Sequence, residues 1–587
     1  MYSHIKNVQI LVALLKEFNI RDVVLAPGGS DIPLIYSIEN DNFFECYSII
    51  DERSLVYFAM GISQQKNVPV VCLCTSGTAV CNFLPGMTEA YYQDVPIVAI
   101  TADKHPYRQG QLETQKIDQT EIFKGICRKS VNLPMVNTSE EEWYCGRLVN
   151  EALLELNHHG RGPVHINIPV LGKISVFNAD ELPKVKKITR IDATASNGVW
   201  LERAETLSRA ERVLLVIGQN ISFSDVDIKN IKVLFKKINC AISIEHLSNL
   251  NCTGALITYP LTDARDNNIL DKLMPDLVIS LGNNVASAGI KPFIRRGAAS
   301  CCHWTVDESG RVRDMFDCLT TVFECPASIF FEKMAVLCAG SNNMEYYSLW
   351  ANSLNAIPEY EVPYSDFYAV RKLTPLIPEH SILHMAILNS TRLFQFNKLA
   401  PNVKVYCNVG ALGIDGCLST FLGQASATEE LSVCVLGDLS YFYDMNATSI
   451  RHVGKNVRIL LLNNAGAAEF HYLVGNKNIP TLNNFISAKN NRSAMGWVES
   501  LGYRYMTAST KEELDKLLPE FVKPSDKPVF FELFTDMEID AEVVLDYYRN
   551  VRTAVGGTKS AIVGKAKSML SDEMKFNVKK MLGRLKK

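Results

Sequence analysis

The 587-residue sequence lacks the features that mark several large classes of protein. No apolar run approaches the ~20 residues that a membrane-spanning helix needs. The formal net charge is only −3, so no basic field indicates a nucleic-acid partner. The 16 cysteines include no Cys-x-x-Cys pair, although Cys301 and Cys302 are adjacent, so zinc-finger spacing is absent and a disulfide framework is not expected in so long a chain. We expect a globular cytoplasmic protein with free, mostly buried thiols.

The N-terminal segment is not typical of a signal peptide. Its apolar stripe at residues 10–15 is broken by Lys16 and Glu17, which predicts an amphipathic helix instead. The length suggests three or four domains, and 47% hydrophobic with 21% charged residues is ordinary for globular protein with ample core.

The most informative stretch is residues 433–470. Two apolar runs, 433–436 and 457–462, end in Gly437-Asp438-Leu439-Ser440 and Asn463-Asn464-Ala465-Gly466, with a helical segment between them. This pattern predicts a βαβ crossover whose two strands end on one edge of a parallel sheet, where ligands bind. The carboxylate of Asp438 and the amide oxygen of Asn464 are hard donors suited to Mg²⁺, which is usually shared with phosphate.

Similar alternation extends through most of the chain. Strands are expected at 23–26, 70–74, 95–101 and 164–168, then at 213–217 and 277–281, and again at 529–534. Continuous apolar strands separated by helices predict an α/β protein with three doubly wound parallel-sheet domains. Neither middle-domain turn contains a complete GxGxxG, so we expect that domain to be structural rather than dinucleotide-binding. The expected boundaries are 1–181, 195–345, 360–549 and a basic tail at 550–587, with a Lys-rich linker at 182–194.

Further motifs in the first and third domains carry a resemblance to a known family. They are Ile49-Ile50-Asp51-Glu52, Cys74-Thr75-Ser76-Gly77-Thr78, Glu89-Ala90-Tyr91-Tyr92, Thr101-Ala102-Asp103, Ile117-Asp118-Gln119, Asn389-Ser390, 410–416, 418–420 and the Gly-Asp and Asn-Asn turns. Together they resemble the 2-succinyl-5-enolpyruvyl-6-hydroxy-3-cyclohexene-1-carboxylate (SEPHCHC) synthase, or MenD, family of thiamine-diphosphate (ThDP) 2-oxo-acid decarboxylases and carboligases. The likeness covers most of residues 1–545 and excludes the tail.

The resemblance implies pyrimidine-binding, middle and diphosphate-binding domains, and a homodimer or homotetramer. Glu52 of one chain would hydrogen-bond the aminopyrimidine of a ThDP whose diphosphate is held by the other chain. Asp438, Asn464 and the Gly466 carbonyl would hold Mg²⁺, and Ile414 would support the bent cofactor. The cofactor-binding set implied is Glu52, Pro27, Gly28, Ser76, Gly77, Thr78, Asn82, Ser390, Gly413, Ile414, Gly437, Asp438, Leu439, Ser440, Asn464, Gly466, Ala467 and Phe470.

The substrate arginines of that family are mostly absent here. Its Pro-Gly-Ser-Arg-Ser turn has Ser30 at the arginine position, and its Asn-Arg-Gly-Ala turn has Val409. Glu469 adds a carboxylate, and each lost charged contact costs roughly 1.5–3 kcal/mol. These changes predict a MenD-like carboligase with an altered substrate pocket. The candidate substrate residues are Ser30, Lys104, His105, Gln115, Lys291, Arg392, Glu469 and His471, of which Arg392 lies two residues before Phe394, where the family has another arginine.

Four interpretations stay open. The first is a ThDP- and Mg²⁺-dependent enzyme that decarboxylates a 2-oxo acid and transfers the acyl-anion equivalent to a less anionic acceptor. The second is SEPHCHC synthase itself, acting on 2-oxoglutarate and isochorismate. The third is a ThDP-binding sensor or subunit without turnover, against which Glu52 argues, and the fourth is a dinucleotide-dependent oxidoreductase. The tail has an apolar face at 574–585 that would pack on its own protein, dock a partner or lie on a membrane surface.

Overall fold

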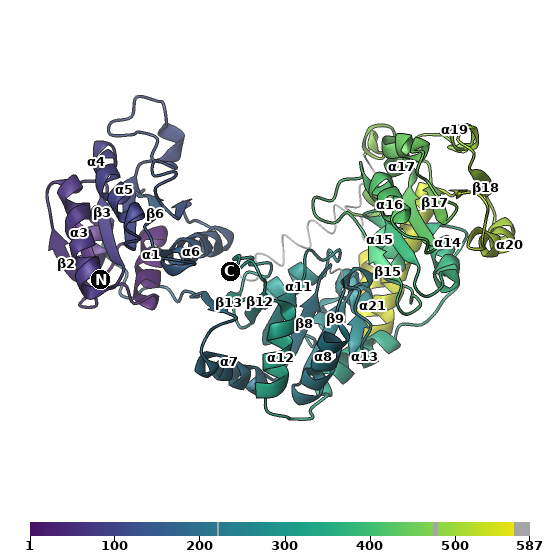
Figure 1. Cartoon of the computed structure of the whole chain (residues 1–587), viewed down its shortest axis with the longest axis horizontal. Helices are drawn as coiled ribbons and strands as arrows, with labels where there is room; N and C mark the ends of the chain where they lie inside the picture. The colour runs from purple at the N-terminus through teal and green to yellow at the C-terminus, as the bar shows by residue number, and fades with distance from the viewer. Residues whose placement is uncertain (220–221, 474–478, 569–587) are drawn as a thin grey trace. The chain divides into compact units, whose positions relative to one another are not determined.

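Parallel strands alternate with helices along the chain (Figure 1). The computed structural model describes residues 1–219, 222–473 and 479–568, without the side chains of 472, 473 and 557–568. The chain folds into two compact units. The first unit contains Met1–Asp192 with Gly310–Glu324, and the second contains Ala193–Ser309 with the residues from Cys325 onward.

The first unit contains a six-stranded sheet. Its strands are β1 (Asp22–Leu25), β2 (Glu45–Ser48), β3 (Val70–Cys74), β4 (Ile97–Asp103), β5 (Lys129–Asn132) and β6 (Val164–Pro169). They lie in the order β2-β1-β3-β4-β6-β5, and every pairing is parallel. Their carboxyl ends therefore share one edge of the sheet.

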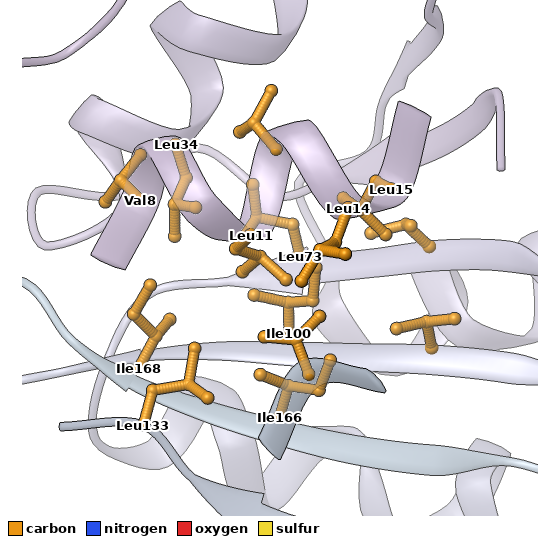
Figure 2. Close-up of a cluster of buried hydrophobic side chains, with 14 of the residues drawn as sticks. Val8, Leu11, Leu14, Leu15, Leu34, Leu73, Ile100, Leu133, Ile166 and Ile168 are labelled. Atoms are coloured by element: carbon orange, nitrogen blue, oxygen red, sulfur yellow. The ribbon is translucent and has the colours of Figure 1, made fainter. Parts of the chain in front are cut away.

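Helices cover both faces of this sheet. They are α1 (Lys6–Glu17), α2 (Ile32–Glu39), α3 (Glu52–Lys66), α4 (Thr78–Asn82), α5 (Leu84–Tyr92) and α6 (Ser139–Leu154), the last followed by the 3₁₀ turn η2 (Glu155–Asn157). Successive strand residues point to opposite faces. Leu73 packs with Leu11 of α1 in one buried cluster (Figure 2), whereas its neighbour Cys72 packs with Leu55 of α3 in another. Burial on both sides explains why these strands are continuously apolar.

A further pair of parallel strands belongs to the first unit. It joins β7 (Thr189–Asp192) to β13 (Leu319–Glu324). Strand β7 lies inside the Lys-rich segment that the sequence predicts as a linker. Only Ile191 of its four residues is buried, so no apolar run indicates a strand there.

The second unit begins with another parallel sheet. Its strands β8 (Val213–Ile217), β9 (Cys240–Ile244), β10 (Ala255–Ile257), β11 (Leu277–Leu281) and β12 (Cys302–Val306) lie in the order β10-β9-β8-β11-β12. The accompanying helices are α7 (Asn197–Arg209), α8 (Asp225–Lys237), α9 (Tyr259–Ala264), α10 (Asn267–Leu270), α11 (Ile290–Arg296), α12 (Ala327–Leu337) and α13 (Glu345–Asn355). The bounds of β8 and β11 agree with the sequence prediction.

The last sheet of the second unit has six parallel strands. These are β14 (Ile382–Met385), β15 (Lys404–Tyr406), β16 (Ser432–Gly437), β17 (Val457–Asn463), β18 (Arg504–Ala508) and β19 (Val529–Phe534), in the order β15-β14-β16-β17-β19-β18. Its helices are α14 (Asp366–Leu373), α15 (Asn389–Phe394), α16 (Cys417–Ser426), α17 (Asp438–Asp444), α18 (Glu469–Leu473), α19 (Met495–Ser500), α20 (Lys511–Phe521) and α21 (Met537–Ser568). Strands β16 and β17 with α17 form the crossover predicted for residues 433–470.

Helix α21 continues through position 550, where the sequence suggests the start of a tail, and through Gly556 and Gly557. Tyr547 and Tyr548 are buried on it, and the ring of Tyr547 stacks on Phe396 with centroids 4.1 Å apart. The apolar face predicted at 574–585 lies outside the described residues. Among the described helices, none is long and apolar enough to cross a bilayer.

The sheets confirm the predicted α/β class with doubly wound parallel sheets. Apart from the isolated antiparallel bridge between Tyr2 and Ala179, the strand pairs among the described residues are parallel. The domain boundaries given above remain predictions. Two strand-end edges carry most of the candidate site residues, one in each unit.

Candidate functional site

In the first unit, the turns after β1 and β3 meet at the carboxyl edge of the sheet. The backbone N–H of Ser30 donates to Thr75 Oγ1 at 3.1 Å, and the Ser30 and Ser76 hydroxyls lie 3.2 Å apart. A Cβ on Gly28 would lie 2.3 Å from the Thr75 Cβ, so only glycine fits between these turns. The structure therefore brings together Gly28, Ser30 and Ser76, which come from separate sequence motifs.

Glu52 is the first residue of α3, directly after the turn that follows β2. The Asp51 carboxylate caps this helix by accepting from the N–H groups of Arg53 and Ser54. Glu52 is half-buried, and its Oε2 accepts from Asn82 Nδ2 at 3.2 Å. Asn82 ends α4, so two residues implied separately by the family resemblance contact each other.

Asp31 is a buried carboxylate beside these turns that sequence reasoning missed. Neither of its side-chain oxygens has a hydrogen-bond partner. Burial raises the pKa of Asp31 to about 6, against the lowering effect of its own backbone N–H, and the nearby charge of Glu52 raises it further. Asp31 follows Ser30, the position where the family resemblance leads one to expect an arginine. That expectation gives no indication that Asp31 lies near Glu52.

The turn after β3 is supported by a buried glutamine. Gly77 has φ +84°, and its N–H donates to Gln119 Oε1 at 3.0 Å. Gln119 in turn donates to the carbonyl of Ala102 at 3.2 Å. Gln115 Nε2 lies 3.5 Å from the Ser76 carbonyl, at the limit of a hydrogen bond. Gln119 thus holds the turn, a role that its place in the Ile-Asp-Gln motif did not reveal.

The other two candidates of this unit make local contacts. Lys104 Nζ donates to the Thr114 carbonyl and lies 4.0 Å from Glu113. His105 Nδ1 accepts from the N–H of Tyr107 at 3.2 Å. Both follow the end of β4, and their assignment as substrate residues remains a prediction.

In the second unit, Asp438 and Asn464 follow the ends of the adjacent strands β16 and β17. The register pairs Gly437 with Leu462, so the two turns start side by side. Both side chains are buried. Burial raises the pKa of Asp438 to about 6, although hydrogen bonds from Asn490 and from the Leu439 N–H lower it.

Two residues absent from the sequence prediction orient this pair. Asp366 Oδ2 accepts from Asn464 Nδ2 at 3.0 Å, and Asn490 Nδ2 donates to Asp438 Oδ2 at 2.9 Å. The backbone N–H of Asn490 also donates to the Ala465 carbonyl at 2.9 Å. Asn490 therefore joins the two turns. Neither residue lies at a strand end, and no local pattern indicates either one.

Asn464 Oδ1 has no hydrogen-bond partner although the residue is only 6% exposed. A buried acceptor of this kind is costly unless an ion or water satisfies it. Together with Asp438 it supplies the oxygen donors that Mg²⁺ prefers. The backbone of Gly466 has φ +155°, and a Cβ there would lie 2.7 Å from the Ser487 carbonyl, so the turn requires glycine. The residues present fit a divalent ion.

The remaining implied cofactor residues lie around these turns. Ser440 Oγ donates to the Ile414 carbonyl at 2.8 Å, which ties the loop of Gly413 and Ile414 to α17. Ala467 N–H donates to the Ser487 carbonyl at 2.8 Å, and Ser390 is buried in α15. Phe470 is 38% exposed on α18.

Arg392 and Glu469 form a buried bidentate ion pair. Arg392 Nη1 lies 2.8 Å from Glu469 Oε2, and Nη2 lies 3.0 Å from Oε1. Arg392 Nη1 also donates to Asn389 Oδ1 at 2.6 Å. The carboxylate that the sequence adds at position 469 is therefore neutralised by the guanidinium of Arg392. His471, two residues further along α18, is buried as well.

Lys291 reaches the turn that contains Val409 through one intermediate residue. Its Nζ donates to Asn284 Oδ1 at 2.8 Å, and Asn284 Nδ2 donates to the Val409 carbonyl at 3.1 Å. Burial lowers the pKa of Lys291, Arg295 lowers it further, and Glu245 opposes both. The ammonium is thus held next to the position where the family resemblance leads one to expect an arginine.

Comparison with known proteins indicates the class of this protein. Residues 5–122 match the family described as "Thiamine pyrophosphate enzyme, N-terminal TPP binding domain". Three parallel α/β sheets and this match define a thiamine-diphosphate-dependent enzyme.

Full-length relatives identify the family. The chain is 38% identical to the 2-succinyl-5-enolpyruvyl-6-hydroxy-3-cyclohexene-1-carboxylate synthase of Bacteroides fragilis, over 94% of this chain and 100% of the relative. It is also 38% identical to the synthase of Phocaeicola vulgatus, over 94% and 99%, and 30% identical to that of Christiangramia forsetii, over 94% and 100%. The chain belongs to the 2-succinyl-5-enolpyruvyl-6-hydroxy-3-cyclohexene-1-carboxylate synthase (MenD) family.

Proposed function

We propose that the protein is a SEPHCHC synthase: with ThDP and Mg²⁺ it decarboxylates 2-oxoglutarate and joins the remaining acyl carbon to isochorismate. The observation that carries this proposal is the 38% identity to enzymes of that name across their whole length. The comparisons favour this reaction over the altered-acceptor reading of the sequence.

The bound cofactor supplies the electron sink that lets a 2-oxo acid lose CO₂. We assign to Glu52 the role of holding or accepting a proton at its Oε atoms, against the aminopyrimidine ring. Its half-buried place at the start of α3 and its hydrogen bond from Asn82 support this role, since they fix the direction of the carboxylate. The turns at Ser76–Thr78 and Pro27–Gly28 would surround the same ring.

We assign Mg²⁺ to Asp438 Oδ, Asn464 Oδ1 and the Gly466 carbonyl, in company with the diphosphate. The orphaned Oδ1 of Asn464 supports this assignment. Ser440, Leu439 and Ala467 would approach the diphosphate from the two turns, and Ile414 would support the cofactor from the loop held by Ser440.

The carboxylate of Glu469 would at first argue against 2-oxoglutarate and isochorismate as substrates, but its ion pair with Arg392 removes this objection. An unpaired carboxylate at 469 would repel the several carboxylates of substrates and product. Because Arg392 neutralises Glu469, the repulsion is removed locally. Lys291 then supplies a cation linked to the Val409 turn through Asn284. Ser30, Lys104, His105, Gln115 and His471 stay as further candidates for substrate contact.

A second candidate function is favoured by the same ion pair. Arg392 cannot give its full bidentate face to a substrate carboxylate while it holds Glu469, and Val409 offers no charge. A related ThDP carboligase acting on a less anionic acceptor is therefore the alternative. Its donor would again be a 2-oxo acid.

One experiment separates the two candidates. The purified chain with ThDP and Mg²⁺ is given 2-oxoglutarate and isochorismate, and the product is followed by mass spectrometry, with Glu52→Gln as control. Glu52-dependent formation of the adduct, with loss of one CO₂, supports the synthase. CO₂ release from another 2-oxo acid, with no adduct from isochorismate, supports the second candidate. No turnover of any 2-oxo acid with or without isochorismate, despite bound ThDP, contradicts both.

We further propose that the chain acts as a homodimer or dimer of dimers, with Glu52 of one copy serving the cofactor whose diphosphate is held by another. Mass measurement in solution tests the assembly. Mixing Glu52→Gln with Asp438→Ala chains tests the sharing, because a shared site regains activity in mixed dimers. We also propose a reducing cytoplasmic compartment, which the 16 free cysteines support.

A further inference from the structure

Outside the sites described so far, three potential metal ligands of the first unit meet at one point. His158 and His159 follow η2, and Glu324 ends β13, which is more than 160 residues further along the chain. One ligand atom from each residue lies within 4.8 Å of the others. Glu324 Oε2 lies 3.0 Å from His158 Nε2, and Glu324 Oε1 lies 2.5 Å from His159 Nε2.

The tautomer of His158 is set by the hydrogen bond that its Nδ1 makes, on the side of the ring away from Glu324. Glu155 Oε2 lies 3.0 Å from His158 Nδ1. An ionised carboxylate only accepts hydrogen bonds, so Nδ1 carries the hydrogen. In the neutral tautomer, Nε2 then holds the lone pair that can bind a metal ion. A histidine that ligates a metal is typically held in this way by a carboxylate on its other nitrogen.

The facing atoms need a positive centre between them. Nε2 lone pairs and carboxylate oxygens repel at 2.5–3.0 Å unless a proton or a metal ion intervenes. With protons alone, His159 can donate from Nε2 as a neutral ring, whereas His158 faces carboxylates with both nitrogens and donates from both only as an imidazolium. One divalent ion in place of the Nε2 protons would instead accept the lone pairs of two neutral rings together with the carboxylate.

The backbone around the cluster is shaped to bring these groups together. His159 has φ +49°, a left-handed conformation that few non-glycine residues adopt. A Cβ on Gly310 would lie 2.6 Å from the Glu324 carboxylate carbon, so glycine makes room for that group. Arg190 donates to the Gly310 carbonyl at 3.0 Å and to Glu155 at 3.0 Å, and its Nε lies 3.8 Å from Glu324. Arg190 thus places a positive charge beside both carboxylates.

We propose that His158, His159 and Glu324 form a binding site for a borderline divalent transition metal, with Zn²⁺ the best match. Two imidazoles and one carboxylate are a donor set typical of zinc, with water as the fourth ligand. Tetrahedral ligand atoms lie roughly 3.3 Å apart, so the exposed His159 ring moves outward by about 0.8 Å from its present 2.5 Å separation on binding. The ion would fasten the β7–β13 pair to the end of α6 and so stabilise the first unit.

The test uses the full chain, freed of metal with a chelator and titrated with ZnCl₂ by calorimetry in the presence of excess Mg²⁺. We expect His159→Gln to weaken the binding of one Zn²⁺ per chain at least tenfold. We expect Glu155→Gln to weaken it about tenfold, as for other residues that orient a ligand. His159 is exposed, so its substitution leaves the fold intact. His452→Gln, an exposed histidine of the second unit, is the matched control and should change nothing.

Cobalt provides an independent readout, because exposed cysteines such as Cys46 and Cys81 also attract soft metals. We expect Co²⁺ in the wild-type chain to give a visible spectrum without the cobalt–thiolate charge-transfer band, and this spectrum to be lost in His159→Gln. We also expect Zn²⁺ to raise the melting temperature of the wild type more than that of His159→Gln. Equal Zn²⁺ affinity in wild type and His159→Gln, or a thiolate spectrum in both, overturns the proposal.

Discussion

Asn464 donates its side-chain N–H to Asp366 Oδ2 at 3.0 Å, and this bond fixes which way the Asn464 amide faces. Asp366 is itself held by Thr535, whose hydroxyl donates to Asp366 Oδ1 at 2.7 Å. With its nitrogen bound to a carboxylate, Asn464 presents Oδ1, the atom suited to a metal ion, to the opposite side. The backbone N–H of Asp366 donates to Asp540 at 2.7 Å, which links this support to α21.

We predict that Asp366→Ala weakens Mg²⁺ binding by about 10–100-fold, because Asn464 loses the partner that orients it. Mn²⁺ binding followed by electron paramagnetic resonance in the presence of ThDP measures this directly. Asp366→Asn keeps an acceptor oxygen and should lose less. Asp515→Ala, which removes an exposed aspartate of α20, is the control, and equal Mn²⁺ affinity in the Asp366→Ala and Asp515→Ala variants would refute the role of Asp366.

Glu52→Gln should reduce CO₂ release by about 10²–10⁴-fold while ThDP still binds, since the amide keeps the shape of the side chain but cannot take up a proton. Calorimetry of ThDP binding and a CO₂ assay measure the two effects separately. Asn82→Ala removes only the hydrogen bond at 3.2 Å and should cost less activity. Full turnover by the Glu52→Gln variant would contradict the proposed role of Glu52 in proton transfer.

Asp31 predicts a pH dependence of stability. Its folded pKa of about 6 lies above the ordinary value of 3.8, so the folded state binds the proton more tightly than the unfolded state between these pH values. Stability therefore falls as pH rises from about 4 to about 6, by about 2–3 kcal/mol from this residue, and is level above that window.

Asp31→Asn should remove that part of the pH dependence, which urea unfolding at pH 4, 6 and 8 measures. The variant and the wild-type chain are compared by how steeply their free energy of unfolding changes with pH. A destabilisation by the buried amide that is the same at every pH does not affect this comparison. Asp103→Asn is not a suitable control, because Asp103 pairs with Lys116 at 2.7 Å. The exposed Asp118→Asn is suitable, and an unchanged slope in the Asp31→Asn variant would contradict the prediction.

The ion pair of Arg392 and Glu469 predicts a strong asymmetry between single and double substitutions. Glu469→Leu alone removes the carboxylate that neutralises the buried guanidinium of Arg392 and should destabilise the chain by about 3–5 kcal/mol. Arg392→Met combined with Glu469→Leu should cost much less, because no buried charge remains. A double-mutant cycle in urea measures the coupling, with the exposed pair of Lys372 and Asp515 as the control, expected to couple by under about 1 kcal/mol. A coupling as small as that of the exposed pair would show that Glu469 does not neutralise Arg392.

The sequence is sufficient to predict the buried strands and their turns. Strands such as β8 and β16 are buried on both faces and therefore read as unbroken apolar runs. The short polar strand β7 escaped prediction because a neighbouring strand, and not its own composition, holds it in place. Helix α21 continues through two glycines despite their low helix propensity, and the burial of Tyr547 and Tyr548 earlier in the helix is a tertiary contact that the sequence pattern does not indicate.

The candidate site divides in the same way. Glu52 stands at a strand end of the first unit, and Asp438 and Asn464 stand at strand ends of the second, where the alternation of strand and helix alone predicts them. Asp31 in the first unit and Asp366 and Asn490 in the second do not follow from that alternation, and their roles depend on three-dimensional contacts that no spacing encodes. The charge of Glu469 illustrates the same limit, because only the contact with Arg392 shows that it is neutralised.

Helix α21 makes hydrogen bonds to two distant parts of the second unit, the Asn464 turn and α9. The N–H of Met537 donates to the Asn464 carbonyl at 3.1 Å, and Arg552 Nη1 donates to the Ala264 carbonyl at 2.9 Å. Fifteen residues of helix span roughly 22 Å. Helix α21 therefore connects α9 to the Asn464 turn by one hydrogen bond at each end. If the helix stays straight, a shift of α9 along the helix axis that keeps both hydrogen bonds also moves the turn that carries Asn464.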